Sequence, residues 1–293
     1  MEKLRVVVLT QEDRFFIPRN IKKLSQVCDI LEIVNIKHKS SLENKVSDFL
    51  KWFGFFQVAK MGLLTINRAI ESIIDNMTGF KYFGGECSIK DTAKFLKVHY
   101  SVTHNVNSKE FLKKMKDLQP DLIVSYSAPQ VFKPPLLAIP KYGVINVHGS
   151  YLPNYRGCLP SFWQLFHGEK FAGATVHYMS EKIDDGDIIV QGQVDISDCK
   201  TMFEVMNRTK ELGGTLLIEA VKQISSGQVE RKKNDTTKGQ YFPGQLRRKQ
   251  RILEETEKNW SNVKFSKYFI LHVISIGLLM RYLYSTIIEK AIV

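Results

Sequence analysis

The sequence lacks the cysteine pattern of a disulfide-stabilised or zinc-binding protein. Its four cysteines are scattered, and none of them forms a C-x-x-C pair: Cys28, Cys87, Cys158 and Cys199. Neither a metal site nor a disulfide framework is therefore expected, and free thiols in a reducing cytoplasm are the default. The N-terminal apolar run is also too short for a signal peptide.

Three common ligand-binding motifs are missing as well. Neither G-x-G-x-x-G nor G-x-x-x-x-G-K-[ST] follows the first predicted strand, which argues against a dinucleotide fingerprint and a P-loop. G-x-S-x-G is absent, so a nucleophile elbow is not expected. The sequence also has no internal repeat and no low-complexity segment.

The composition is that of a globular, basic protein. The chain has 293 residues, of which 44% are hydrophobic and 25% are charged, enough for one large domain or two smaller ones. Its formal net charge of +12 favours anionic partners, such as phosphates, polycarboxylates, nucleic acid or an acidic membrane surface. For any single basic patch, a generically basic soluble surface is the simpler interpretation.

Alternating strand and helix patterns predict an α/β fold. Continuous apolar runs such as RVVVLT (5–10) and YGVINVH (142–148) are typical of buried parallel strands, and helical patterns separate them. This alternation predicts a Rossmann-like, mostly parallel sheet flanked by helices. GATVHYMSE (173–181) and DIIVQGQVDI (187–196) predict an antiparallel pair instead.

Several residues mark where helices begin or weaken. Ser88 and Ser108 precede helical patterns and are expected to be N-caps, because a serine hydroxyl accepts a hydrogen bond from the first backbone amides. The helical pattern from about residue 201 to residue 227 contains Gly213 and Gly214, which are expected to weaken it.

Polar side chains interrupt an apolar strand pattern at Asn146 and His148. Residues two apart in a strand share one face, and ligands of open α/β sheets bind outside the carboxyl ends of the strands. The turn that carries Asp184 can return a carboxylate to this amide and imidazole. Such a set suits acyl transfer to an amine, with a donor for the oxyanion and groups that move a proton. Taken singly, a strand-end histidine and an Asp-Asp-Gly turn are more often structural.

The stretch from Asn146 to Ile189 resembles the signature of the folate-dependent formyltransferases. That family has the pattern N-x-H-x-S-x-L-P-x-x-R-G, followed by P-x-x-W, G-x-T-x-H and D-x-G. The matching residues are Asn146, His148, Ser150, Leu152, Pro153, Arg156, Gly157, Pro160, Trp163, Gly173, Thr175, His177, Asp184 and Gly186. The resemblance extends over roughly residues 81–227 and, more loosely, over residues 1–36.

The resemblance implies a catalytic set, a formyl donor and a donor site. The implied catalytic residues are Asn146, His148 and Asp184, and the implied donor is 10-formyltetrahydrofolate, with no metal. The pterin is expected between two segments, formed by Ser127, Ala128, Pro129, Gln130, Val131 and Phe132 and by Ser180, Ile183 and Asp184. Val131 and Phe132 are expected to form its apolar wall, and Ser150, Arg156 and Gly157 to form a substrate loop. His177 is interpreted as structural.

The family pattern leaves two segments unexplained. We expect a catalytic domain at residues 1–227 with a helical insert at about 40–79, and a C-terminal extension at residues 228–293. The extension has a basic segment and an apolar helix, whose uninterrupted apolar core is shorter than the ~20 residues of a spanning helix. An amphipathic or docking helix is therefore expected rather than a membrane span.

The acceptor is less constrained than the donor. Only 109 residues follow Asp184, too few for the long helical pattern and a C-terminal barrel domain like that of methionyl-tRNA formyltransferases. We therefore expect a small anionic amine acceptor, an amino sugar on a nucleotide or related carrier. The first alternative is methionyl-tRNA formylation, with tRNA as partner. The second is a non-catalytic formyltransferase-like scaffold at a membrane.

The expected location is the cytoplasm. Peripheral contact of the C-terminal tail with the cytoplasmic face of a membrane is an alternative for the apolar segments. Packing of these segments in a homo-oligomer is a further alternative.

Overall fold

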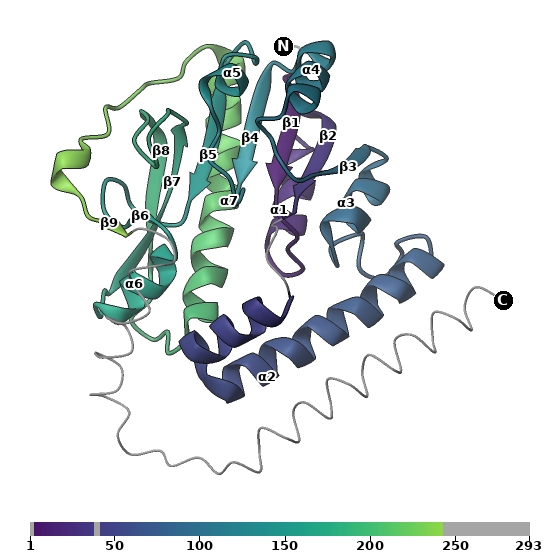
Figure 1. The fold of residues 1–293 in the computed structure, drawn as a ribbon, viewed down its shortest axis with the longest axis vertical. Coiled ribbons are helices and arrows are strands. Elements are labelled where there is room, and N and C mark those ends of the chain that lie inside the picture. The colour runs from purple at the N-terminus through teal and green to yellow at the C-terminus, as the bar shows by residue number, and fades with distance from the viewer. Residues whose placement is uncertain (1–2, 38–41, 243–293) are drawn as a thin grey trace. The chain divides into compact units, whose positions relative to one another are not determined.

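The computed structural model describes residues 3–37 and 42–242 and contains a seven-stranded sheet of order β3-β2-β1-β4-β5-β7-β8 (Figure 1). The strands are β1 (Arg5–Thr10), β2 (Asp29–Ile36), β3 (His99–Thr103), β4 (Leu122–Tyr126), β5 (Val144–His148), β7 (Phe171–Tyr178) and β8 (Ile188–Asp195). The pairings among β1 to β5 are parallel, whereas β7 pairs antiparallel with both β5 and β8. The predicted α/β fold with a mostly parallel sheet is confirmed.

Seven helices accompany the sheet in the described part of the chain. They are α1 (Ile17–Leu24), α2 (Leu42–Met77), α3 (Ile89–Leu96), α4 (Lys109–Leu118), α5 (Pro134–Leu137), α6 (Pro160–Phe166) and α7 (Met202–Ser226). The Ser88 hydroxyl accepts a hydrogen bond from the Asp91 amide, and the Ser108 hydroxyl accepts one from the Phe111 amide. Both predicted N-caps are therefore confirmed.

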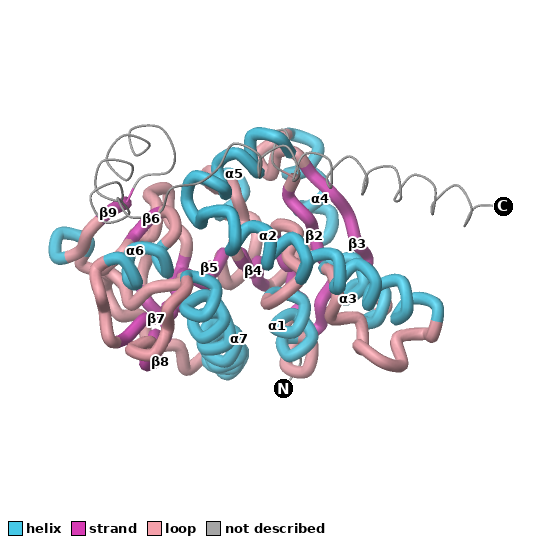
Figure 2. Tube along the Cα trace, turned by 90° about the horizontal axis from the view of Figure 1, so that it is seen from below, coloured by secondary structure: helices cyan, strands magenta, loops and turns pink. Residues whose placement is uncertain are grey.

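Helices cover the two faces of the sheet and enclose two hydrophobic cores. In Figure 2, α1 and α7 lie on one side of the strands, and α4 and α5 lie on the other. Ile145 and Val147 of β5 belong to the core that includes Leu217 of α7. The second core contains Met115 of α4 and Val144. Alternate residues of β5 thus face opposite layers, as the strand period requires.

Helix α7 runs through Gly213 and Gly214 without a break. A Cβ atom at Gly214 would lie 2.2 Å from Asn20 Oδ1, and one at Gly213 would lie 2.8 Å from Val147 Cγ1. The absence of side chains lets α7 approach α1 and the sheet closely. Tertiary packing therefore outweighs the low helix propensity of glycine here.

The insert expected at about residues 40–79 forms α2, which confirms its helical character. Helix α2 crosses the carboxyl ends of the parallel strands (Figures 1 and 2). Ser72 Oγ donates to Asp91 Oδ2 over 2.6 Å, and Asn76 Nδ2 donates to Asp91 Oδ1 over 2.8 Å. These bonds attach the C-terminal part of α2 to the beginning of α3.

Within the described ranges, no helix combines the length and apolarity needed to cross a bilayer. The apolar helix expected in the C-terminal tail lies outside the described residues.

Candidate active site

One face of β5 and β7 is apolar and the other is polar. Asn146 and His148 point away from the layer that packs on α7. In the antiparallel register, Asn146 pairs with His177 and His148 pairs with Thr175. Residues paired across strands lie on the same face. The sheet therefore gathers two imidazoles, an amide and a hydroxyl on one surface.

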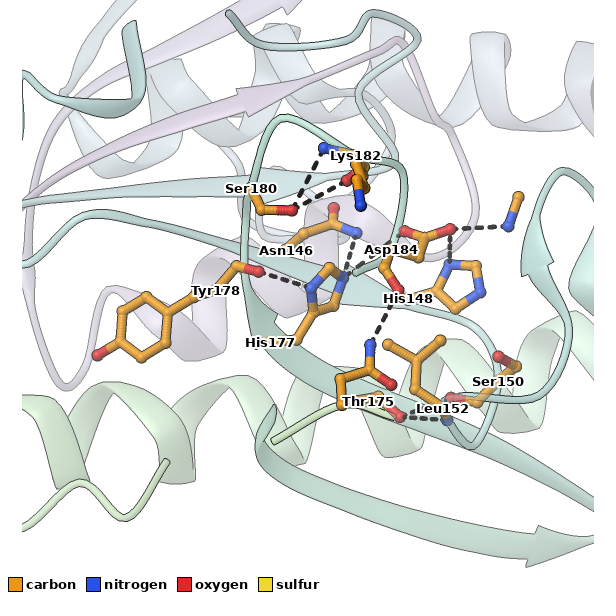
Figure 3. A network of polar contacts seen from close by, with 12 residues as sticks. Asn146, His148, Ser150, Leu152, Thr175, His177, Tyr178, Ser180, Lys182 and Asp184 are labelled. Atoms are coloured by element: carbon orange, nitrogen blue, oxygen red, sulfur yellow. Dashed lines mark hydrogen bonds and ion pairs between the residues drawn. The ribbon is translucent and has the colours of Figure 1, made fainter. Parts of the chain in front are cut away.

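The turn between β7 and β8 brings Asp184 onto this polar face (Figure 3). Asp184 Oδ2 accepts a hydrogen bond of 2.8 Å from the Gly157 amide and lies 3.5 Å from His148 Nδ1. Asp184 Oδ1 lies 3.6 Å from His177 Nε2. The structure thus brings together all three residues that the resemblance implied to be catalytic, with Asp184 only 10% exposed.

His177 lies between Asn146 and Asp184. Its Nδ1 must donate to the Tyr178 carbonyl at 2.8 Å, because a carbonyl oxygen only accepts. With Nδ1 as the donor, Nε2 is the ring atom that can accept from Asn146 Nδ2, 3.2 Å away. This contact orients the Asn146 amide and leaves its second N–H for another acceptor. The structural interpretation of His177 thus becomes more specific, because the ring positions the site.

Burial and mutual attraction set the charges of the site. Burial lowers the pKa of His148 and outweighs the opposing attraction of Asp184. The neutral ring donates through Nε2 to the Tyr155 carbonyl, 2.9 Å away. Burial raises the pKa of Asp184, but His148, His177 and the Gly157 amide outweigh it, and the net pKa lies below the usual value. The structure therefore favours an ionised Asp184 beside a neutral His148.

The predicted substrate loop is tied closely to the sheet. Ser150 Oγ donates to the Asn154 carbonyl over 2.6 Å, and Thr175 Oγ1 donates to the Ser150 carbonyl over 2.7 Å. Ser150 is fully buried, so its hydroxyl shapes the loop and does not contact solvent. Gly157 contributes the amide that holds Asp184.

A segment beyond the predicted catalytic domain completes the site. Residues 232–242, here called the strap, return to the loop, where β9 (Tyr241–Phe242) pairs with β6 (Arg156–Gly157). Asn234 Nδ2 donates to the Asp184 carbonyl over 2.9 Å, and Thr236 Oγ1 donates to Asp185 Oδ1 over the same distance. Arg156 Nη2 donates to the Thr236 carbonyl over 3.3 Å. No motif in the sequence indicated these contacts.

The hydrogen bond from Asn234 of the strap supports the backbone of Asp184. Asp184 has a left-handed backbone, with φ of 49°, a conformation that costs on the order of 1–3 kcal/mol and needs support from its surroundings. We expect Asn234→Leu to lower turnover about tenfold, because it removes the donor to the Asp184 carbonyl. Asn234→Gln, which retains the amide, should restore part of the activity. Equal turnover of the wild type and Asn234→Leu would contradict this role.

The two segments expected to hold the pterin begin on the same layer of the fold. Ala128 of the first and Met179, just before the second, pack against the same core. Val131 and Ile183 are 53% and 42% exposed, so both segments offer apolar side chains to solvent. The side chain of Phe132 is fully buried in the core. It therefore supports the loop and does not form the exposed apolar wall that the resemblance implied.

Polar contacts fix the first of these segments. Gln130 Nε2 donates to the His104 carbonyl over 2.7 Å, while Gln130 Oε1 accepts from the Val106 amide over 3.0 Å. In the second segment, Ser180 Oγ accepts from the Lys182 amide over 3.3 Å. Exposed apolar groups beside ordered backbone suit a flat heteroaromatic ring. The residues that are present therefore fit a pterin.

Lys210 on α7 lies close to the site, although no motif in the sequence indicated it. Its Nζ contacts Ser127 Oγ at the end of β4 and lies 4.8 Å from the centroid of the Tyr126 ring. Tyr126 pairs with Val147, so Lys210 reaches the level of His148. Burial lowers the pKa of Lys210, against the attraction of Asp13. The side chains that it contacts in the described structure are neutral. Lys210 comes close to the site only because α7 packs against the sheet.

Among the described residues, no group of three or more His, Cys, Asp or Glu side chains has the arrangement of a metal site.

Comparison with known proteins agrees with this geometry. Residues 85–221 match the family model described as formyl transferase. The chain is 38% identical over 132 residues to a methionyl-tRNA formyltransferase of Clostridium novyi (strain NT), an alignment that covers 45% of this chain and 43% of that protein. The chain thus spans less than half the length of this relative. The resemblance to the formyltransferases is confirmed.

Solved structures share the fold. The glycinamide ribonucleotide transformylase 1 of Symbiobacterium toebii has a TM-score of 0.54 at 15% identity and covers 80% of this chain and 95% of its own. WlaRD, a sugar 3N-formyl transferase crystallised in the presence of dTDP and 5-N-formyl-THF, has a TM-score of 0.54 at 14% identity. That match covers 83% of this chain and 70% of the other.

Proposed function

We propose that this chain, whose residues 85–221 match the formyl transferase family, transfers a formyl group from 10-formyltetrahydrofolate to an amine. One observation carries the proposal: Asn146, His148 and Asp184 converge on one polar face of the sheet. A scaffold that only binds has no need for a buried, ionised carboxylate beside an imidazole. Such perturbed groups are typical of functional sites.

The residues divide the chemistry among them. The folate supplies the electrophilic formyl carbon, which it carries on N10. The free N–H of Asn146 is placed to stabilise the charge that develops on the formyl oxygen as the amine attacks. Asp184 accepts the proton that the amine loses and passes it to Nδ1 of the neutral His148, which faces it. The imidazolium formed in this way transfers that proton towards N10 as the carbon–N10 bond breaks, so both side chains return to their starting states. Formamide and tetrahydrofolate result, with no net change in protons.

The acceptor is proposed from the comparisons and from charge. The 38% identity to a methionyl-tRNA formyltransferase supports the methionyl-tRNA alternative better than the amino-sugar acceptor preferred from the sequence. Lys210 favours an acceptor with an anionic group, because its amine lies near His148 and would pair with such a group. Both acceptors carry phosphates. The cytoplasm remains the predicted location for either reaction.

A transfer assay tests the proposal. The full chain is incubated with 10-formyltetrahydrofolate and, separately, with methionyl-tRNA, thymidine- and uridine-diphosphate amino sugars, and glycinamide ribonucleotide. We expect one of these acceptors to gain the mass of one formyl group, at a rate that depends on the folate. Absence of transfer to all of them, together with no folate binding by calorimetry, would favour the scaffold.

A further inference from the structure

A hollow of about 320 Å³ lies between α2, the segment that follows β1 and the first turns of α7. We call it the insert pocket, because one wall comes from the insert helix α2. Phe15, Phe16 and Phe203 form its aromatic floor, with the Phe203 centroid 5.7 Å from Phe15 and 5.3 Å from Phe16. Asn67 and Asn207 also line it and are exposed. It is separate from the polar face that carries Asp184.

The charges around the insert pocket are paired. Arg68 lies 2.8 Å from Glu71, and Arg19 lies 4.0 Å from Glu86. Paired arginines attract a phosphate weakly, because the neighbouring carboxylates offset their charge. Aromatic rings beside neutral amides suit a flat ring that has hydrogen-bonding edges and no charge. The lining therefore fits a nucleobase better than a phosphate.

Helix α7 connects this pocket to the catalytic face. Phe203, Asn207 and Lys210 are spaced by four and three residues, so they share one side of α7. A rise of 1.5 Å per residue places Lys210 about 10 Å along the axis from Phe203. Lys210 ends at Ser127, beside the carboxyl end of β5. A nucleotide-linked amino sugar, which carries its amine, its phosphates and its base in this order, would meet the catalytic set, Lys210 and the insert pocket in turn.

We infer that the insert pocket binds the nucleobase of a nucleotide-bearing acceptor. This inference rests on the proposed function and adds the part of the acceptor that α2 recognises. The same nucleoside chemistry occurs in a nucleotide-linked amino sugar and in the 3′-terminal adenosine of an aminoacylated tRNA. In both cases the insert helix supplies contacts that the sheet domain alone lacks.

Direct binding tests the inference without any formyl transfer. Uridine 5′-diphosphate, thymidine 5′-diphosphate and adenosine 5′-monophosphate are titrated into the full chain by calorimetry. We expect at least one to bind, with the pyrimidines indicating a sugar nucleotide and the adenosine indicating a tRNA end. Asn207→Trp, which fills the hollow, should weaken that binding at least tenfold. Thr215→Trp, at an exposed position of the same helix, should leave it unchanged.

A second variant separates a loss of binding from a loss of folding. Asn67→Ala removes one exposed amide from α2 and should weaken the same probe severalfold, while thermal unfolding stays that of the wild type. Failure of every probe to bind, or equal binding to the wild type and both pocket variants, would overturn the inference. A chain that transfers formyl groups but binds no probe would refute the pocket alone. A chain that binds a nucleotide but transfers nothing would refute the proposed reaction alone.

Discussion

Replacing Asn146, His148 or Asp184 by alanine is expected to abolish most formyl transfer while the protein stays folded. Loss of one oxyanion donor costs on the order of 10²–10³ in rate, and loss of a general acid or base costs about 10²–10⁴. We expect Asn146→Ala to fall in the first range and His148→Ala and Asp184→Ala in the second. The measurement is single-turnover formylation with saturating folate, combined with thermal unfolding.

A histidine elsewhere on the sheet gives the matched control. The side chain of His99, on the edge strand β3, is 67% exposed, and His99→Ala should retain wild-type turnover. The double variant His148→Ala/Asp184→Ala should be little slower than the slower single variant, because groups that act as a unit have non-additive effects. Near-normal turnover of His148→Ala would remove that residue from the proposed mechanism.

Gly186→Ala is expected to impair both the stability and the activity of the protein. A Cβ atom at Gly186 would lie 1.9 Å from the Tyr178 carbonyl oxygen, so the turn that carries Asp184 must shift. Overpacking of this kind costs about 1–3 kcal/mol of unfolding free energy. A displacement of about 1 Å in a catalytic group lowers the rate on the order of 10²-fold. Urea denaturation and the single-turnover assay measure the two effects.

Gly62→Ala is the control for this backbone effect. Gly62 lies within α2, and a Cβ atom there has no neighbour within 4 Å. Alanine has a higher helix propensity than glycine by about 1 kcal/mol, so this variant should be at least as stable as the wild type. If Gly186→Ala matched Gly62→Ala in stability and turnover, the close approach at Tyr178 would not constrain the turn.

The two faces of the β5–β7 pair are covered differently. On one face, Ala174 and Val176 pack with the core that includes residues of α7. On the other, the Gly157 amide and the Tyr155 carbonyl of the loop meet Asp184 and His148, and the Asn234 side chain of the strap donates to the Asp184 carbonyl. Irregular backbone can satisfy such groups where a helix, whose own polar groups are paired, cannot. This explains why the catalytic groups lie beneath the loop and the turn.

Local patterns in the sequence determined the elements of the fold and the chemical groups of the site. The apolar runs predicted the strands, and Ser88 and Ser108 marked helix starts, because period and capping depend on neighbours in sequence. The pair Asn146 and His148 stood out for the same reason, since polar residues two apart interrupted a buried strand. The family pattern added Asp184, which spacing alone could not separate from an ordinary turn.

Only the tertiary structure decided which distant residues support those groups. The antiparallel register placed His177 opposite Asn146, packing of α7 delivered Lys210 to Ser127, and the strap brought Asn234 to the Asp184 carbonyl. The same packing turned Phe132 inward and required Gly214 for the approach to α1. Such contacts join residues far apart in the chain, and their geometry follows from how whole elements pack. A local sequence pattern contains no record of that packing.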